Sequence, residues 1–505
     1  DYVLSPYLEY ERIRHDQYKD TQAINAFLQQ YPNQSISNRL KYEWLLSLPK
    51  RDEWGTFLDN YDSSLQSRTL NCYYLRALYR SGEKEQALEK TAKAWTVSGS
   101  SPKACDPLFR IWLKSDYFKP DYAYERVKLA LNRGHTSLAS YASNFLKGDQ
   151  HKAAATMIWV HKQPSILAST KLFPSSNPYM KDVVEHGIKR RIRRRPDLAL
   201  KYWNTHRDRF EFSPSEITSL EKRIYLGLAR QYDKSASSLL ASLPEEGGAV
   251  ASHARDVLEW QIRVSLRNRD WDSVLKWIRV LEKTDGMKQK WHYWKHQAYH
   301  ALNIDVPKLD QIQLEKLAET RSYYGFMAAE FLGQPLTLTN RPLPIELDTY
   351  EAFVQRPEID RAKELLNIGQ TKTAKREWQY LAQHKENPAG LMSLAKLAYQ
   401  WGWHNRAIRA VIAADHWHDL SIRFPTPYKE TFLAAASKVN LESSWLFAIA
   451  RQESAFAETS RSGAGARGLM QLMPATAKQT ARKIGLKHSN SALYDPKYNI
   501  TLGST

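Results

Sequence analysis

One carboxylate near the C-terminal end of this sequence stands in a setting that suits acid catalysis. Residues 441–452 (LESSWLFAIARQ) have helical spacing, and one face of that helix would carry Leu441, Trp445, Ala448, Ile449 and Gln452. Glu453 follows directly, with Ala455 and Phe456 beside it. Among apolar neighbours, desolvation favours the protonated form of a carboxyl group, which a general acid needs. We therefore expect Glu453 to be catalytic.

A second carboxylate is not supplied by the neighbouring sequence. Glycosidases ordinarily use two carboxylates about 5–10 Å apart. No Asp or Glu occurs from Thr459 to Tyr494. Glu442 precedes Glu453 by eleven residues, which is roughly 16 Å on a continuous helix. Asp495 stays open as a second carboxylate, because the fold could bring it back.

A cluster of glycines follows the expected helix. Gly463, Gly465 and Gly468 fall within six residues, although the whole chain has 20 glycines. Such clustering predicts backbone at positive φ or a close approach to another group. The cluster is not a nucleotide-binding loop, because it lacks the GK[ST] ending of a P-loop and follows a helix. An isolated helix-terminal glutamate would ordinarily be a solvated side chain, and the glycines argue against that interpretation here.

These residues resemble the catalytic signature of soluble lytic murein transglycosylases, whose core is similar to goose-type lysozyme. The resemblance includes Phe424, Pro425, Glu453, Ser454, Ser462, Gly465, Ala466, Gly468, Leu469, Met470, Gln471, Met473, Pro474, Thr476, Ala477, Tyr494, Asp495, Pro496, Asn499 and Ile500. It implies that Glu453 is catalytic and that substrate is bound by Ser462, Gln471, Met473 and Gly468. Ser462 could instead cap a turn, and Met470 is expected in the core.

The resemblance also implies an activity. A lytic transglycosylase cleaves the β-1,4 bond between N-acetylmuramic acid and N-acetylglucosamine in peptidoglycan and forms 1,6-anhydro-N-acetylmuramic acid. Glu453 would act first as acid and then as base, with no cofactor and no metal. Two alternatives stay open: a hydrolytic lysozyme on the same fold, and a non-enzymatic helical-repeat scaffold that binds a polyanion.

The chain is strongly basic, with a formal net charge of +19. This charge predicts an anionic partner, which could be nucleic acid, a membrane surface or an acidic polymer. The densest basic run, residues 189–195, is either a solvated helix face or a polyanion-binding patch. The resemblance favours peptidoglycan glycan strands and no nucleic acid, and a monomer that is free to work at the outer-membrane periphery.

Two cysteines, Cys72 and Cys105, leave the redox state open from their number alone. They could be two buried thiols or close a 33-residue loop, and their spacing matches no CxxC pattern. The resemblance implies a periplasmic enzyme, in which a disulfide is expected. No apolar run approaches 18 residues, so no transmembrane segment is expected. The sequence begins at Asp1 without a secretory leader, as expected for a mature form.

Helical periodicity runs through residues 1–330, for example at Val274, Trp277, Ile278 and Leu281. A weak repeat pairs a glycine with an alanine five residues later, at Gly82 and Ala87, Gly369 and Ala374, and Gly402 and Ala407. In this pattern the glycine ends one helix and the alanine permits close packing of the next. The 16 Trp and 28 Tyr are then expected mainly in the core between helices.

The expected fold is all-α. Residues 1–345 would form a superhelix or ring of helix pairs (a U-type domain), residues 346–423 a helical linker domain, and residues 424–505 a lysozyme-like catalytic domain. The proline-rich stretch 333–344 marks the first boundary. The family's catalytic domain continues to a Tyr-Asn-Ala-Gly motif, so we expect it to be incomplete at Thr505.

Overall fold

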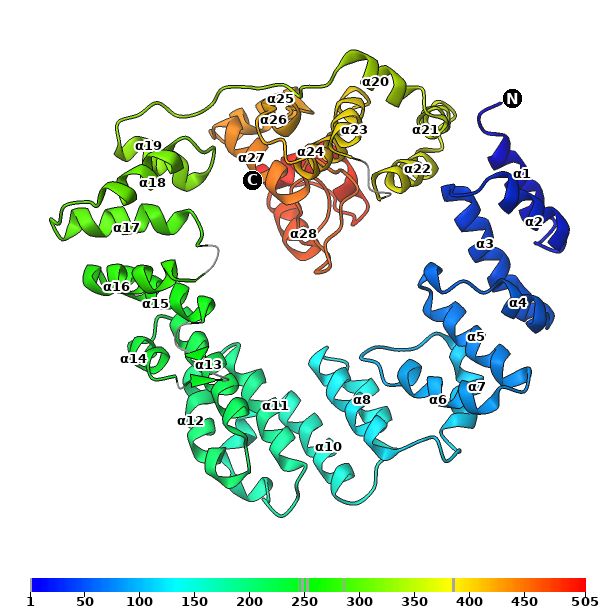
Figure 1. Ribbon diagram of the computed structural model, residues 1–505, viewed down its shortest axis with the longest axis horizontal. Helices are drawn as coiled ribbons and strands as arrows, with labels where there is room; N and C mark the ends of the chain where they lie inside the picture. Colours follow the sequence, from blue (N-terminus) through cyan, green and yellow to red (C-terminus); the bar gives the residue numbers. More distant parts are fainter. Residues whose placement is uncertain (1, 244, 247–248, 251–253, 285–286, 384–386) are drawn as a thin grey trace. The chain divides into compact units, whose positions relative to one another are not determined.

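The computed structural model describes residues 2–243, 245–246, 249–250, 254–284, 287–383 and 387–505. Regular structure in these residues is helical apart from one short antiparallel pair, β1 (Glu245–Glu246) and β2 (Ala249–Val250) (Figure 1). The chain divides into two compact units. Unit 1 contains Asp1–Ser47 and Thr339–Thr505, and unit 2 contains Leu48–Leu338. The all-α prediction is confirmed.

In unit 2 each helix packs mainly on its neighbours in the sequence, as helix pairs do (Figure 1). Short 3-10 helices join several of them. The α-helices of unit 2 are α4 (Trp54–Asn60), α5 (Arg68–Arg80), α6 (Lys84–Trp95), α7 (Asp106–Trp112), α8 (Pro120–Asn132), α9 (Thr136–Ser143), α10 (Gly148–Lys162), α11 (Met180–Ile192), α12 (Pro196–His206), α13 (Pro214–Arg230), α14 (Ala236–Ala241), α15 (Arg255–Asn268), α16 (Trp271–Glu282), α17 (Lys290–Ala301), α18 (Lys308–Ala318) and α19 (Tyr323–Phe331).

Helix α16 shows how the sequence pattern becomes packing. Its start is fixed by Asp270, whose side chain accepts a hydrogen bond from the Ser273 N–H. The predicted apolar stripe is buried, with Val274 and Ile278 fully enclosed. Burying such a side chain contributes about 1.5–3 kcal/mol. The predicted periodicity of this helix is confirmed.

The glycine–alanine repeat also has its expected structure. Gly82, Gly369 and Gly402 each follow a helix and have φ of +103°, +76° and +71°. The paired alanines are fully buried against neighbouring helices: Ala87, Ala374 and Ala407. The prediction that 333–344 is an extended connector is confirmed as well, because α19 ends at Phe331 and the next helix begins at Leu347.

Unit 1 joins the two ends of the chain. Its helices are α1 (Ser5–His15), α2 (Thr21–Gln30), α3 (Ser35–Ser47), α20 (Leu347–Val354), α21 (Pro357–Asn367), α22 (Thr371–Gln383), α23 (Pro388–Gln400), α24 (His404–Ala413), α25 (Leu420–Arg423), α26 (Lys429–Lys438), α27 (Ser443–Ser454), α28 (Pro474–Lys483) and α29 (Pro496–Ser504). The predicted domain boundaries after residues 345 and 423 both fall inside unit 1 and stay a prediction.

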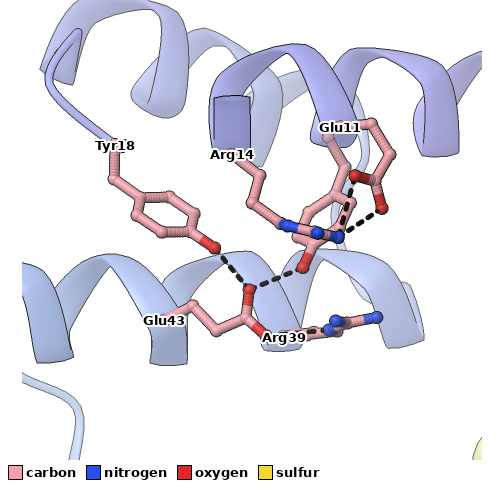
Figure 2. Close-up of polar contacts among 6 residues, drawn as sticks. Glu11, Arg14, Tyr18, Arg39 and Glu43 are labelled. Carbon is pink, nitrogen blue, oxygen red and sulfur yellow. Dashed lines mark hydrogen bonds and ion pairs between the residues drawn. The ribbon is translucent and has the colours of Figure 1, made fainter. Parts of the chain in front are cut away.

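A carboxylate on α3 holds the first helices together (Figure 2). Glu43 accepts hydrogen bonds from the Tyr10 hydroxyl at 2.5 Å, the Tyr18 hydroxyl at 2.6 Å and the Arg39 Nε at 2.9 Å. Desolvation alone would raise the pKa of Glu43, but these three donors outweigh it and the pKa is lowered. Glu43 is therefore a charged anchor between α1 and α3.

The N-terminal segment packs against helices more than 350 residues further along the chain. Leu4 shares a small apolar cluster with Leu365 and Ala374. The Tyr7 hydroxyl donates to the buried carboxylate of Glu377, whose pKa is raised by desolvation. This contact ties α1 to α22 within unit 1.

The basic run at the end of α11 is partly engaged with other groups. Lys189 pairs with Glu185 at 2.5 Å, and the Arg190 Nε donates to the His161 carbonyl at 2.7 Å. Arg195 forms a bidentate pair with Asp197. Arg193 and Arg194 are exposed. Among the described residues, no helix is both long enough and apolar enough to cross a membrane.

The predicted disulfide is confirmed. Cys72 on α5 is bonded to Cys105 at the end of the 3-10 helix Lys103–Cys105, with the two Cα atoms 4.9 Å apart. Both cysteines are buried in the core of unit 2, close to the fully buried rings of Trp95 and Trp112. The aromatic residues thus lie between helices here, as expected.

Replacing both cysteines by alanine should destabilise this part of unit 2. The disulfide closes a loop with a sequence separation of 33, for which the chain-entropy model gives about 3–4 kcal/mol. Denaturant unfolding of Cys72→Ala/Cys105→Ala against the oxidised parent measures this loss. As a check on the bond itself, neither thiol of the unreduced, denatured parent should react with an alkylating agent. Alkylation of both would contradict the assignment.

Candidate active site

Glu453 lies in the last turn of α27, one residue before the helix ends. The predicted helix therefore continues through Ser454 and includes the carboxylate. Ala455 ends it in the left-handed conformation with φ of +50°, and Phe456 follows at +64°. The chain reverses at once, and the carboxylate is left at the C-terminal edge of the helix. Its side chain is exposed.

The face of α27 that carries the predicted stripe is the exposed face. Trp445 is 68% exposed and Ile449 is 40% exposed, while Leu446 and Ala450 on the other side are buried. The expectation that apolar neighbours shield Glu453 from water is therefore wrong, because its side chain is exposed. The buried side of α27 is set instead by its packing on Phe432 of α26 and on Leu469.

The residue after Glu453 fastens the helix end to the glycine-rich turn. The Ser454 hydroxyl donates to the Leu469 carbonyl at 2.7 Å and also lies 3.2 Å from the Ala450 carbonyl. Phe456 is buried and packs edge-on to Phe432 and Phe447. Both contacts fix the direction in which Glu453 leaves the helix.

A buried amide holds the turn from the opposite side. The Asn499 side chain on α29 is fully buried. Its Oδ1 accepts from the Met470 N–H at 2.8 Å, and its Nδ2 donates to the carbonyls of Arg467 at 3.1 Å and Leu493 at 2.9 Å. Both polar atoms of its side chain are therefore used, and the glycine-rich turn and the segment at Leu493 are joined to α29 at one point.

Gly468 is the closest approach in this turn. It has φ of +75°, and a Cβ there would lie 2.1 Å from the Leu493 carbonyl oxygen and 2.3 Å from the Asn499 Nδ2. Gly465 has φ of +96° with open space around it. The predicted need for glycine is confirmed at these two positions. It is wrong for Gly463, which has no positive φ and nothing near its missing Cβ.

The structure places the other candidate substrate residues along the same turn. The Ser462 Oγ accepts from the Ala466 N–H at 3.0 Å, and the Gln471 Nε2 donates to the carbonyls of Ser460 and Gly468. Both side chains therefore brace the turn. Within the described part of the chain, neither the Ser462 hydroxyl hydrogen nor the Gln471 Oε1 has a partner. Met473, at the start of α28, is 43% exposed.

Four carboxylates besides Glu453 occur after residue 423, and none of them is part of the glycine-rich turn. Asp495 caps α29 by accepting the Tyr498 N–H at 2.7 Å, and Glu458 accepts a hydrogen bond from Tyr428. Burial, together with Glu458, raises the pKa of Tyr428. The other two lie at helix starts, Glu430 in the first turn of α26 and Glu442 at the N-cap of α27. Glu453 has no hydrogen bond or ion pair with another described residue.

Comparisons with known families agree with this arrangement. The Transglycosylase SLT domain family matches residues 430–505, and the Soluble lytic murein transglycosylase L domain family matches residues 352–420. Glu453 and the glycine-rich turn lie inside the first match, and α21 to α24 lie inside the second.

A solved relative decides the family. The lytic transglycosylase Slt of Pseudomonas aeruginosa, determined as an inactive glutamate-to-glutamine variant, is 33% identical, with a TM-score of 0.84, and the match covers all of this chain and 81% of that one. This chain belongs to the soluble lytic transglycosylase family. The Soluble lytic murein transglycosylase of Escherichia coli K12 is 26% identical over 510 residues, 77% of its length. The crystal structure of the 70-kDa enzyme of E. coli, at 24% identity and a TM-score of 0.80 over all of this chain and 81% of that one, has the same fold.

The contacts of Asn499, Ser454 and Glu458 were not predicted from the sequence. Asn499 and Ser454 were noticed as part of a motif, but no local pattern indicates that their side chains tie the turn together. Glu458 was passed over although it follows Glu453 by five residues. A buried asparagine or serine leaves no periodic signal, because its role depends on backbone groups that reach it from distant positions.

Gly468→Ala should disrupt the turn, and Gly463→Ala is its matched control. The first adds a methyl group against a carbonyl oxygen and Asn499 at positive φ, and we expect a cost of about 2–4 kcal/mol. The second adds the same group in open space and should stay within about 0.5 kcal/mol. Denaturant unfolding, with hydrogen exchange at Met470 to localise the effect, compares the two. Equal stability of both variants would contradict the close approach at Gly468.

Proposed function

We propose that this protein is a lytic transglycosylase that cleaves the β-1,4 bond between N-acetylmuramic acid and N-acetylglucosamine in peptidoglycan, with Glu453 as its one catalytic carboxylate. Membership of this family supports the reaction class. The name of the E. coli relative, soluble lytic murein transglycosylase, supports murein as the substrate. The observation that supports the role of Glu453 is its position. It is exposed at a helix end beside the glycine-rich turn, whereas Asp495 and Glu458 are held by other hydrogen bonds and Glu430 and Glu442 lie at helix starts.

The reaction begins with Glu453 as the acid. Its carboxyl group donates a proton to the glycosidic oxygen, and the bond from the anomeric carbon of the muramoyl residue breaks. The carboxylate that remains then accepts the proton of the C6 hydroxyl of the same residue. The C6 oxygen attacks the anomeric carbon, and the 1,6-anhydro product leaves without consuming water. One group serves in both steps, as microscopic reversibility allows.

The geometry of the turn supports this use of one residue. Ser454 ties the end of α27 to the turn, and Asn499 holds the turn itself, so the backbone position of Glu453 does not depend on the ligand. A glycan laid over Trp445 and Ile449 would displace water from Glu453, which favours the neutral acid required for the first step. The Ser462 hydroxyl and Gln471 Oε1 are then available to sugar hydroxyl or acetamido groups.

The relative from Pseudomonas supplies a second line of support. Its structure was determined as an inactive variant in which a glutamate is replaced by glutamine. A loss of activity from a single carboxylate-to-amide change is what a one-carboxylate mechanism requires.

We further propose a periplasmic location and a monomeric enzyme that works on glycan strands near the outer membrane. The disulfide buried in unit 2 supports this location, because disulfides form and persist in oxidising compartments such as the periplasm. The positive net charge of +19 suits a wall polymer with carboxylates. The catalytic part itself has exposed cations in and after the turn: Arg461, Lys478, Arg482, Lys483 and Lys487.

Glu453→Gln in the full-length protein should abolish turnover while leaving the fold and glycan binding intact. Glutamine keeps the volume of the side chain but can neither donate nor accept the proton. General acid–base catalysis is worth about 10²–10⁴-fold, and losing both roles should reach the upper end of that range or exceed it. The measurement is mass spectrometry of muropeptides released from purified sacculi, where the anhydro product is one water lighter than the hydrolytic one.

Glu458→Gln and Asp495→Asn are the matched controls, because each removes one charge from the same part of the chain. Both should release anhydro-muropeptides at rates within about tenfold of the parent, since neither group takes a proton in this mechanism. An equally inactive, well-folded Asp495→Asn would restore a two-carboxylate mechanism. Release of products without the loss of water would favour the lysozyme alternative.

Binding of inactive Glu453→Gln to sacculi should weaken steeply as salt is raised. Exposed charges are screened beyond a Debye length of about 10 Å at 0.1 M and about 3 Å at 1 M. Sedimentation of the protein with sacculi across that range gives the dependence. An affinity that does not change with salt would remove the positive charge as the cause of adsorption.

A further inference from the structure

The basic run at the end of α11 is part of a larger charged surface of unit 2. Helix α11 packs on α13, and α13 packs on α15 (Figure 1). The segments at the C-terminal ends of these three helices are residues 193–197, 230–234 and 267–270, and together they contain seven cations and three acids. We call this surface the basic edge. Its cations that are exposed and form no ion pair with a described residue are Arg193, Arg194, Arg230, Lys234, Arg267 and Arg269.

Two contacts show that the three helix ends form one surface. The Gln231 Nε2, just after α13, donates to the Arg194 carbonyl at 3.2 Å. The guanidinium carbon of Arg267, in the last turn of α15, lies 4.0 Å from the centre of the Tyr232 ring. Packed helices lie about 8–10 Å apart, so a row of three helix ends extends over roughly 16–20 Å. That length is too great for one small anion and suits an extended partner.

The acids of the basic edge do not neutralise these cations. Asp197 is paired with Arg195, which is why that arginine is not among the unpaired ones. Asp233 and Asp270 accept backbone N–H groups at the start of the helices that follow them. Both carboxylates are therefore used to begin the next helix. The basic edge keeps a net positive charge, which attracts an anionic partner.

Tyr232 lies at the turn after α13 in a conformation that a bulky side chain rarely adopts. Its φ is +57°, and it is 48% exposed. The equivalent turns after α8 and α23 contain Gly134 and Gly402, which adopt positive φ without strain. The fold therefore does not require a tyrosine here, and the Tyr232 hydroxyl forms no hydrogen bond with any described residue. An exposed tyrosine beside arginines is typical of a residue that lies at a membrane interface.

We propose that the basic edge docks the protein on an anionic phospholipid surface, with its arginines on lipid phosphates and Tyr232 among the headgroups. Five of its six unpaired cations are arginines, whose planar guanidinium matches a phosphate in a bidentate way. Clusters of about four to eight Lys or Arg residues are typical of surfaces that bind anionic lipids. A wall polymer with carboxylates would be bound by charge alone and gives no role to Tyr232.

This docking does not rest on the proposed catalysis. The basic edge lies in unit 2, whereas Glu453 lies in unit 1. Binding to lipid needs no turnover, so each proposal can fail while the other stands. Cations at helix C-termini also stabilise the helices themselves through their dipoles, and the experiment therefore has to separate lipid binding from stability.

The test measures sedimentation of the full chain with vesicles of two compositions. One is phosphatidylcholine alone, and the other is two parts phosphatidylcholine to one part phosphatidylglycerol. The protein should bind the anionic vesicles and not the neutral ones, and raised salt should weaken that binding because it screens exposed charges. Equal binding to both compositions, or binding to neither, would overturn the proposal.

Two double variants with the same loss of charge locate the binding. Arg193→Gln/Arg267→Gln removes a cation from each end of the row and should bind anionic vesicles at least about tenfold more weakly. Arg110→Gln/Arg133→Gln removes two exposed arginines of unit 2 outside the basic edge and should bind like the parent. Both variants should keep the melting temperature of the parent, because all four side chains are exposed. Equal vesicle affinity of the two variants would overturn the proposal.

Tyr232→Asn and binding to sacculi distinguish a lipid surface from a wall polymer. Asparagine adopts positive φ readily, so this variant should fold. Loss of the apolar ring should weaken vesicle binding at least about threefold with every charge in place. Sedimentation of Arg193→Gln/Arg267→Gln with sacculi on ice should match the parent. Unchanged vesicle binding by Tyr232→Asn, or a loss of sacculus binding by the double variant as large as its loss of vesicle binding, would overturn the assignment to lipid.

Discussion

The catalytic end of this molecule depends on one buried amide and the glycine that faces it. Asn499 binds three backbone groups at once, and Gly468 passes so close that no side chain fits between them. Without that contact the chain from Ser460 to Pro474 has little regular structure to define it, since only isolated bridges join Arg461, Arg467 and Leu472. The Leu469 carbonyl of this turn also accepts the Ser454 hydroxyl. The contact between Asn499 and Gly468 therefore also determines where α27 ends and in which direction Glu453 leaves it.

The sequence predicts those features of the fold and the site that depend on residues close together in the chain. It does not predict those that depend on contacts between distant residues. The stripe of α16 and the glycine–alanine repeat are local patterns, and the structure agrees with both. The helix expected over 441–452 is present as Ser443–Ser454 and includes Glu453. The family motif identified the turn as a whole. The face of α27 that is exposed was not predictable, because a helix can present an apolar stripe to solvent, to a ligand or to another segment, and periodicity alone does not distinguish them. The role of Asn499 depends on carbonyls at Arg467 and Leu493, which no window around it contains.

Unit 1 joins the two ends of the chain, and the contacts between them could not be predicted from the sequence either. The hydroxyl of Tyr7 meets Glu377 across 370 residues of sequence, and Leu4 meets Leu365 in one apolar cluster. Both ends of these contacts look like ordinary amphipathic helices when examined alone. Glu377 illustrates why the pairing is specific. A buried carboxylate needs a donor, which Tyr7 supplies, and Arg361 from a different segment lies 3.5 Å away as its ion pair. Sequence positions that satisfy one another in this way carry no shared pattern.

The exposure of Glu453 is consistent with an enzyme whose substrate is a polymer. A deeply enclosed carboxylate would be desolvated in advance, but a long glycan strand cannot thread into an enclosed cavity without unfolding its walls. The alternative is to fix the backbone that carries the carboxylate and to leave its face open. Under the proposed function, a strand lying across Trp445 and Ile449 would then exclude the water itself. Rigidity then has to come from the far side of the helix, where Leu446, Ala450 and Ser454 are buried. The division of α27 into an open apolar face and a closed face tied to the turn is what such a site requires.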